Sequence, residues 1–282
     1  MTGARAGHEA HVGLSAWPGR LLAASVALIY AFIFVPILIT ASVSFNAGSL
    51  SVFPPRGFSL RWWEVAFTPQ WLGPLVFSLE LAALSAVVTV LIGTPLAFAL
   101  HRYRFIGRNL IQALVMGPLV LPALITGIAL LQFLYLVGLD YVVGFWALLV
   151  GYVTICLPFG VRTVGISLAG VPPSLELAAM NLGATRLATL RDVTLPLIKS
   201  GVFAGAAFAF VHAFTDVSLS LFVGSPGARP ITVEILDAMD FGFEPTLAAL
   251  SVITLAVPLA LIWLLQRWMG IGEFIYGRHS DE

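Results

Sequence analysis

The most diagnostic segment of this chain reads Glu176-Leu177-Ala178-Ala179-Met180-Asn181-Leu182-Gly183-Ala184 and is followed by Val193-Thr194-Leu195-Pro196-Leu197. It lies in a polar, helix-capable region, residues 162–200, between two long apolar runs. A long and ordered loop of this kind is unusual in a membrane protein unless another protein docks onto it. We therefore expect the loop to be a docking element for a separate chain.

The composition is that of an integral membrane protein. Of the 282 residues, 59% are hydrophobic and only 10% are charged, whereas a soluble domain carries about 25% charged residues. Such a chain cannot cover a water-facing surface. The formal net charge is zero, and no nucleic-acid partner is expected. The single cysteine, Cys156, excludes a disulfide within the chain and a metal site built from several thiolates.

Six apolar stretches are long enough to cross a bilayer, which takes about 20 helical residues. They cover residues 20–43, 74–100, 110–137, 143–161, 201–223 and 246–268. Prolines inside them, including Pro118 and Pro122, are expected to act as kinks, because neighbouring groups can satisfy the freed carbonyls. The sequence predicts an all-α membrane protein with six transmembrane helices over residues 20–268 and short tails at 1–19 and 269–282.

The basic residues predict that both termini face the cytoplasm. With the N-terminus inside, the cytoplasmic segments hold 11 of the 14 Lys and Arg residues, and the outer segments hold only Arg56, Arg61 and Arg229. Cytoplasmic loops of membrane proteins carry such an excess. This N-in, C-in orientation puts the loop at 162–200 in the cytoplasm. The outer loops are net acidic. This charge either concentrates a cationic solute near the membrane, or it results simply from the preference of basic residues for the cytoplasmic side.

Several catalytic motifs are absent from the sequence. The only lysine, Lys199, follows Ile198, so the chain has no Gly-Lys-Ser/Thr element of a phosphate-binding loop. It has no His-Glu-x-x-His zinc motif and no Gly-x-Ser-x-Gly elbow. A hydrolase pair of His212 with Ser218 or Ser220 is disfavoured, because a lone helical histidine is more often a packed residue. We expect no catalytic residue, metal site or cofactor in this chain.

The docking loop reads as a short helix–turn–helix. Ser174 can cap a first helix over 174–183, Glu176 suits the positive end of its dipole, and Gly183 is a natural stop. A second helical stretch covers 184–192, and Pro196 marks the start of the fifth span. The alternative is an amphipathic helix lying on lipid, although the segment lacks the basic cluster expected of one.

The spacing in this loop resembles the signature of the permease family of ABC importers. That signature is Glu-Ala-Ala, three residues, Gly, nine residues and Ile/Val-x-Leu-Pro, and this chain keeps it from Ala178 to Pro196. One departure is that Leu177 occupies the glutamate position, with the glutamate one residue earlier. The resemblance implies an ATPase-coupling site made of Glu176, Leu177, Ala178, Ala179, Gly183, Leu195 and Pro196. The ionic contact to the ATPase would come from Glu176 or be replaced by packing of Leu177.

Two further segments resemble the spermidine/putrescine branch of that family, namely Phe58-Ser59-Leu60-Arg61-Trp62-Trp63 and Phe214-Thr215-Asp216-Val217. The same branch includes permeases for 2-aminoethylphosphonate, ferric iron and thiamine, which remain alternative substrates to a polyamine. A secondary transporter is a distant alternative, since no internal repeat is visible.

The resemblance implies a type I ABC importer permease fold in the bacterial inner membrane. It also implies two ATPase subunits that bind ATP and Mg²⁺, and an extracytoplasmic substrate-binding protein. A second permease subunit is expected to form a heterodimer with this one, with a homodimer as the alternative. The chain itself would not be an enzyme.

Two acidic residues fall inside predicted spans, Glu80 and Asp216. A charge buried in a bilayer is costly, so such residues usually face a cavity or a partner. We expect Asp216, with Thr215 and Ser218, to line the substrate path and meet a cationic solute, and Glu80 is a weaker candidate. The alternative for both acids is a structural ion pair or a helix cap.

Overall fold

The computed structural model describes residues 16–269 and is helical over most of this range. The rest of the predicted tails, residues 1–15 and 270–282, lies outside the described part of the chain. Within residues 16–269, five helical segments are long and apolar enough to span a membrane, and a bent pair of helices supplies a sixth if it is taken as one span. The long helices of the five segments are α1 (Ala16–Val43), α3 (Pro69–Arg102), α6 (Phe145–Ala169), α9 (Leu195–Thr215) and α12 (Pro245–Met269). The predicted all-α membrane fold is confirmed.

The third predicted span, 110–137, is broken rather than kinked. The helices α4 (Arg108–Met116) and α5 (Ala123–Leu136) form the bent pair, at an angle of 109°. Between them lies a short 3-10 turn, η1 (Gly117–Leu119). Pro118 and Pro122 both lie at the break, where each removes a backbone N–H and disfavours a helical conformation in the residue before it. Two prolines this close together end the helix, so the expectation of a mere kink is wrong here.

The ends of two spans also differ from the prediction. The helix α6 continues to Ala169 instead of ending at 161, because its buried face continues through Val161, Val164 and Leu168 while Arg162 stays exposed. The helix α9 ends at Thr215 instead of 223, and the short helix α10 (Ser220–Val223) follows after a turn. The connection between α6 and α9 is therefore residues 170–194.

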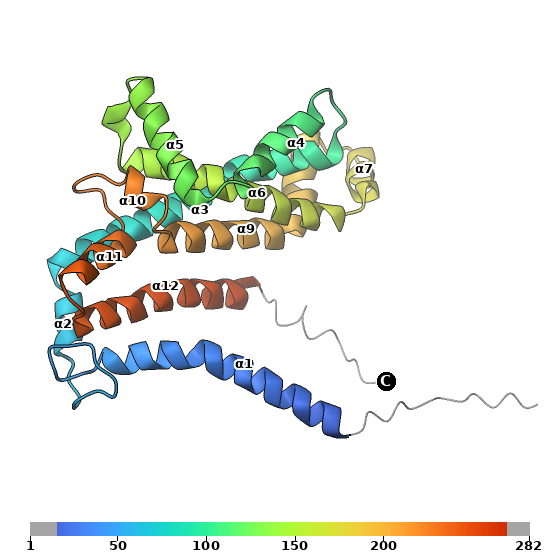
Figure 1. The fold of residues 1–282 in the computed structure, drawn as a ribbon. Coiled ribbons are helices and arrows are strands. Elements are labelled where there is room, and N and C mark those ends of the chain that lie inside the picture. The colour runs from blue at the N-terminus through green and yellow to red at the C-terminus, as the bar shows by residue number, and fades with distance from the viewer. Residues whose placement is uncertain (1–15, 270–282) are drawn as a thin grey trace, which may run out of the picture.

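The core is built where α3, α6 and α9 pack pairwise against one another. Figure 1 shows α12 and α1 below this group and α4 and α5 above it. Fully buried side chains fill the centre, among them Leu81, Leu148, Tyr152, Phe214 and Leu250. Gly205 of α9 lies in this core: a Cβ there would stand 2.8 Å from Thr163 Oγ1 and 3.2 Å from the Cα of Gly160. Gly205 therefore lets α9 approach α6 closely, within the chain.

The remaining short elements gather at the two ends of the bundle. Figure 1 shows the start of α1, the end of α12 and the 170–194 connection at the right, and α2, α10 and α11 at the left. We call these the α7 end and the α11 end. The short elements are α2 (Arg61–Ala66), η2 (Asp140–Val142), α7 (Pro173–Asn181), α8 (Arg186–Thr189), η3 (Leu190–Thr194) and α11 (Ile231–Phe241).

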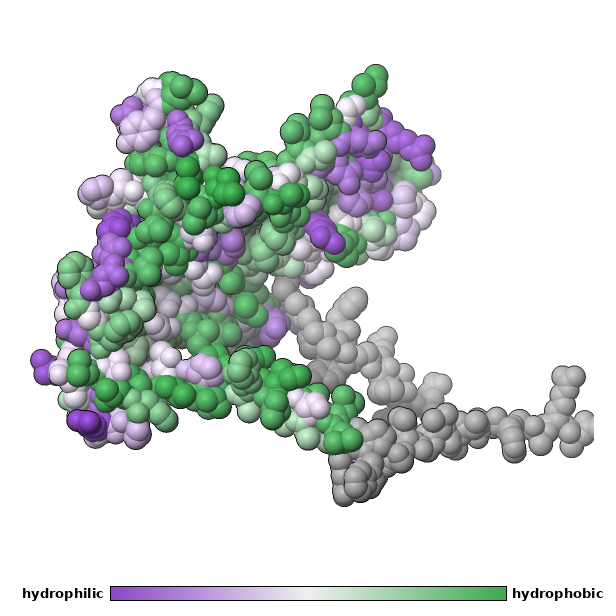
Figure 2. Space-filling model, viewed as in Figure 1, coloured by the Kyte–Doolittle hydropathy of each residue, from purple (hydrophilic) through white to green (hydrophobic). Residues whose placement is uncertain are grey.

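The surface is apolar between these two ends. Figure 2 shows hydrophobic residues along α1 and over α4 and α5, with hydrophilic residues mainly at the two ends. No residue in the 18-residue apolar window of α1 is buried within the chain, and large side chains such as Leu28 and Phe32 stand exposed along it. An exposed apolar surface of this extent requires lipid or another protein against it.

Candidate coupling site

The helix α7 begins and ends at the residues that its sequence dictates, with one exception. Pro173 occupies its first turn, where the missing N–H would have no partner. Gly183 has φ of +94°, and the N–H of Ala184 donates to the carbonyl of Ala179 at 3.1 Å, which closes the helix in a Schellman motif. Ser174 does not cap the helix, because Pro172 holds the cap position and no side chain bonds there.

The connection from α7 to α9 is nearly continuous helix. Thr185 caps α8, since its Oγ1 accepts a hydrogen bond from the N–H of Ala188 at 3.2 Å. The π-helical turn η3 then leads directly into α9. Pro196, in the first turn of α9, cannot donate to a carbonyl one turn earlier, and a wider turn accommodates this. The predicted second helix, 184–192, is thus α8 and the beginning of η3.

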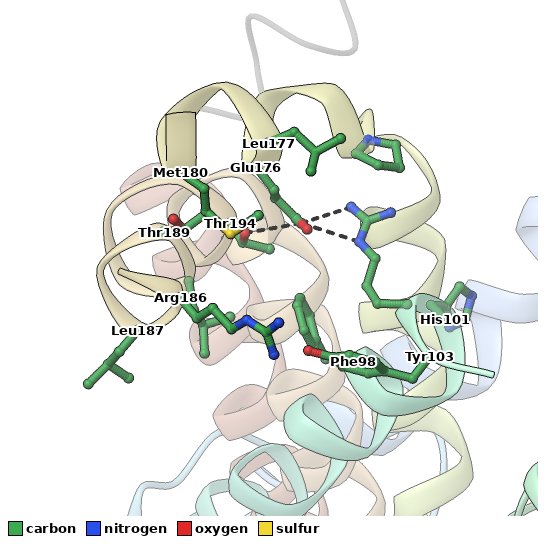
Figure 3. A pocket seen from close by; sticks show the side chains of 13 residues that line it. Phe98, His101, Tyr103, Glu176, Leu177, Met180, Arg186, Leu187, Thr189 and Thr194 are labelled. Carbon is green, nitrogen blue, oxygen red and sulfur yellow. Dashed lines mark hydrogen bonds and ion pairs between the residues drawn. The ribbon is translucent and has the colours of Figure 1, made fainter. Parts of the chain in front are cut away.

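A cavity of about 710 Å³ lies between the end of α3 and this connection. Figure 3 shows Arg186 extending from α8 toward Phe98 and Tyr103. All three residues line the cavity. The other residues that line it are His101, Arg102, Pro173, Glu176, Leu177, Met180, Leu187, Thr189, Leu190 and Thr194. The cavity therefore lies between the 170–194 connection and the end of the membrane-spanning helix α3.

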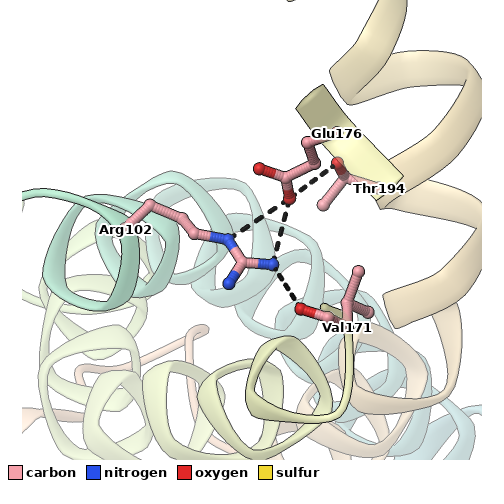
Figure 4. Close-up of polar contacts among 4 residues, drawn as sticks. All are labelled: Arg102, Val171, Glu176 and Thr194. Carbon is pink, nitrogen blue, oxygen red and sulfur yellow. Dashed lines mark hydrogen bonds and ion pairs between the residues drawn. The ribbon is translucent and has the colours of Figure 1, made fainter. Parts of the chain in front are cut away.

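The side chain of Glu176 forms an ion pair with Arg102 of the same chain (Figure 4). Arg102 Nη2 and Nε donate to Glu176 Oε1 at 3.0 and 3.2 Å. Thr194 Oγ1 donates to the same oxygen at 3.2 Å, and Arg102 Nη2 also donates to the carbonyl of Val171 at 2.8 Å. The network therefore ties α7 to the end of α3 and to the turn before α9.

The outward face of α7 is apolar instead of acidic. The side chain of Glu176 is only 14% exposed, whereas Leu177 is 56% and Leu182 90% exposed. Ala178 is exposed beside them and Ala179 is half-buried. Leu195 and Pro196 are exposed at the start of α9. A protein that docks on α7 would meet Leu177, with Glu176 already engaged.

Asp216 lies just beyond the C-terminal end of α9, not within the helix as predicted. Its Oδ2 accepts a hydrogen bond from the N–H of Leu219 at 2.9 Å and one from the Tyr152 hydroxyl at 3.4 Å. Its carbonyl accepts from Thr232 Oγ1 at 2.9 Å. Asp216 thus caps the turn into α10, while Thr215 and Ser218 beside it are exposed.

Glu80 lies on the exposed side of α3, near the α11 end. It lines a cavity of about 340 Å³ together with Arg229 and Glu234. Arg229 pairs with Glu234 at 3.9 Å and with Asp237. Within residues 16–269, no hydrogen bond or ion pair joins Glu80 to Asp216, so the two acids are not brought into one polar cluster.

Sequence reasoning did not identify Arg102, Thr194 and Tyr152 as partners of the candidate residues. In the sequence, Arg102 is one of the 11 basic residues of the cytoplasmic segments, with nothing that marks it as a partner of Glu176. Its partner Glu176 lies 74 positions away in the chain, and only the packing of α3 against the 170–194 connection brings them together. A buried threonine next to the Leu-Pro pair gave no signal of its own.

Comparisons with known proteins agree on one family. Residues 89–270 match the family model described as "Binding-protein-dependent transport system inner membrane component". The spermidine/putrescine transport system permease protein PotC of Escherichia coli (strain K12) is 33% identical over 246 residues, which cover 86% of this chain and 92% of PotC. The putrescine transport system permease protein PotI of the same strain is 31% identical over 234 residues, covering 80% of this chain and 82% of PotI.

A solved structure shows the same fold at low sequence identity. It is a crystal structure of a bacterial ABC transporter involved in the import of the acidic polysaccharide alginate, which aligns with a TM-score of 0.69 at 16% identity. The alignment covers 89% of this chain and 95% of that chain. The helical arrangement is therefore that of ABC importer permeases.

Proposed function

We propose that this chain, which belongs to the binding-protein-dependent transport system inner membrane component family, is a permease subunit of an ATP-driven polyamine importer. The chain is a multi-pass protein of the inner membrane. The observation that carries the substrate class is the similarity to PotC and PotI over at least four fifths of the chain. Acidic groups near the α11 end, such as Glu80 and Glu234, suit a cationic solute.

ATP and Mg²⁺ are bound by a partner, which receives α7. The exposed Leu177 and Leu182 fit a groove of that ATPase chain, where a buried leucine contributes about 1.5–3 kcal/mol. Glu176 acts from the inside by holding α7 against Arg102. The motion of the ATPase subunits passes through this attachment to α3 and, by way of Thr194, to α9. The apolar face of Leu177 replaces the ionic contact of the family glutamate.

The α7 end faces the cytoplasm. The placement of the α1 start, the α12 end and α7 on one side of the bundle supports this orientation (Figure 1). So does the excess of Lys and Arg in the segments at this end. An extracytoplasmic binding protein then delivers the solute at the α11 end.

Two ATPase subunits and a second permease subunit complete the importer. The exposed apolar surface of α1 supports a permease partner or lipid at that face. We place a different permease chain there, making a heterodimer, as expected for the polyamine branch.

Asp216 contributes its charge to the path while its Oδ2 caps the turn before Leu219. The exposed Thr215 and Ser218 flank it with hydroxyl groups. Glu80 acts at a second position, in the cavity that it lines with Arg229 and Glu234. A cationic solute would thus meet carboxylates at two separate positions.

Reconstitution tests this proposal. The chain is placed in proteoliposomes with its ATPase, its permease partner and its binding protein, with ATP on the α7 side. We expect ATP-dependent accumulation of labelled spermidine or putrescine that excess unlabelled polyamine competes away. Accumulation of 2-aminoethylphosphonate, thiamine or ferric iron instead would contradict the polyamine assignment. Uptake driven by an ion gradient without ATP would contradict the importer class.

A further inference from the structure

The cavity under α7 adjoins an apolar groove on the membrane-spanning part of the chain. The groove has a volume of about 460 Å³ and runs between α3 and α9. Its walls include Leu91, Pro95 and Ala99 from α3 and Ile198 and Val202 from α9. The cavity and the groove have three lining residues in common, Phe98, Tyr103 and Leu190. One long ligand can therefore extend from the cavity, which holds the charged residues, into the apolar groove.

One positively charged side chain that lines the cavity takes part in none of the ion pairs within residues 16–269. Arg102 and Glu176 neutralise each other. Arg186 is exposed, belongs to none of those ion pairs, and extends its guanidinium toward Phe98 and Tyr103 (Figure 3). An arginine presents several donors to a phosphate and can bind it in bidentate fashion. The charge of the cavity therefore favours an anionic group.

A buried hydroxyl without a partner points to the same ligand. Thr189 is only 5% exposed and lines the cavity. Its Oγ1 is buried and has no hydrogen-bond partner in the described structure. A buried polar atom left without a partner is destabilising, so a ligand group that bonds it would be stabilised there. A headgroup phosphate or hydroxyl offers such a bond.

We infer that the cavity and the groove together bind one anionic phospholipid. Its headgroup lies against Arg186 and Thr189, and an acyl chain runs along Pro95, Ala99 and Val202. Basic pockets between membrane helices bind acidic headgroups in this way. The occupant is a lipid and not a protein side chain, because the groove continues along apolar positions of two membrane-spanning helices. This inference goes beyond the transport function and does not depend on the solute.

Native mass spectrometry of the purified full-length chain, with the partners that co-purify, tests the site. The probes are phosphatidylglycerol and phosphatidylethanolamine with the same acyl chains, and inorganic phosphate alone. We expect the wild-type chain to bind phosphatidylglycerol about fivefold more tightly than phosphatidylethanolamine, the effect of about one basic residue near the headgroup. The Arg186→Gln variant should lose this preference and Arg186→Lys should keep it.

Two further variants make the test specific. Arg191→Gln is the matched control, because Arg191 is an exposed arginine of η3, 84% exposed, that does not line the cavity. It should bind phosphatidylglycerol as the wild-type chain does. Val202→Phe should fill the groove and weaken lipid binding several-fold while leaving the binding of inorganic phosphate unchanged.

Three results would overturn the inference. The first is equal binding of the two lipids by the wild-type chain. The second is an Arg186→Gln variant that binds lipid normally but no longer retains the ATPase, which would assign the cavity to a protein side chain. The third is tight binding of inorganic phosphate with no gain from acyl chains, which would make the site one for a free anion. None of these results bears on which solute is transported, so the lipid site and the polyamine assignment can fail separately.

Discussion

The Arg102 guanidinium donates two hydrogen bonds, at 3.0 and 3.2 Å, to a single carboxylate oxygen of Glu176. Both side chains are largely shielded, with 15% and 14% of their surface exposed. The pair joins the last turn of α3 to the first turn of α7. The glutamate that stands one residue before the motif position thus has a partner within its own chain, and it fixes the position of α7 relative to the bundle.

Removing this carboxylate should loosen α7 locally. Glu176→Ala leaves Arg102 half-satisfied, at a cost of about 1–3 kcal/mol for a shielded charged group that loses its partner. We expect faster amide hydrogen exchange over residues 173–183, with the exchange of α3 and α6 largely unchanged. Asp192→Ala is the control, because Asp192 pairs with Arg191 at 3.8 Å in an exposed position where ion pairs contribute about 0–1 kcal/mol. Unchanged exchange in Glu176→Ala would show that the ion pair does not hold α7.

The turn after α7 should depend on glycine. Gly183 has φ of +94°, a conformation that costs a residue with a side chain about 1–2 kcal/mol. Gly183→Ala should therefore weaken ATPase association and transport-coupled ATP hydrolysis. Gly107→Ala is a matched control, since Gly107 has φ of +88° but lies before α4, outside the α7 connection. We expect a comparable strain in Gly107→Ala with normal ATPase association. Equal loss of association in both variants would mean that general instability, not the α7 turn, is responsible.

Leu177 should supply the docking energy that the family glutamate supplies elsewhere. Burial of a leucine contributes about 1.5–3 kcal/mol, so Leu177→Ser should weaken ATPase binding about tenfold or more. Ile106→Ser is the comparison, because Ile106 is fully exposed on the link between α3 and α4, and it should bind the ATPase normally. Affinities can be measured by titrating immobilised permease complex with the ATPase chain. Normal binding by Leu177→Ser would contradict apolar docking at this position.

The two roles of Asp216 can be separated by substitution. Asp216→Asn keeps a side-chain oxygen that can accept from the N–H of Leu219, so the turn into α10 should remain. It removes the charge, and we expect polyamine uptake to fall about tenfold, the equivalent of about 1.4 kcal/mol. Asp216→Ala should lose both the cap and the charge, and lower stability as well. Normal uptake by Asp216→Asn at normal abundance would leave Asp216 with a capping role only.

Local rules predicted much of the coupling site. The spacing from Ala178 to Pro196 and the stop at Gly183 are both signals within this segment, and α7 forms and ends there as expected, although Ser174 does not cap it. The membrane spans followed from apolar length alone. Each of these features depends on one continuous stretch of the chain, which is why the sequence was sufficient for them.

Longer-range features were not predictable in the same way. The Arg102–Glu176 pair requires the packing of segments 74 positions apart. The end of α9 at Thr215 is set by Asp216, whose carboxylate bonds ahead to Leu219 rather than back into the helix. Hydropathy could not detect this end, because the residues on both sides are equally apolar. Likewise, α6 continues past Arg162 because one side of the helix stays buried in the core. The position of a charged residue in the sequence does not reveal such a buried side.

Site-specific cross-linking tests the central claim, that α7 docks on an ATPase chain, most directly. The only cysteine, Cys156, is buried, so a Cys156→Ala background allows a single probe cysteine at Leu182→Cys, which is 90% exposed beyond α7. The control is Phe241→Cys, 94% exposed at the end of α11. A photoreactive maleimide should link position 182, but not position 241, to the ATPase. Absence of an ATPase adduct at 182, or equal adducts at both positions, would contradict the account.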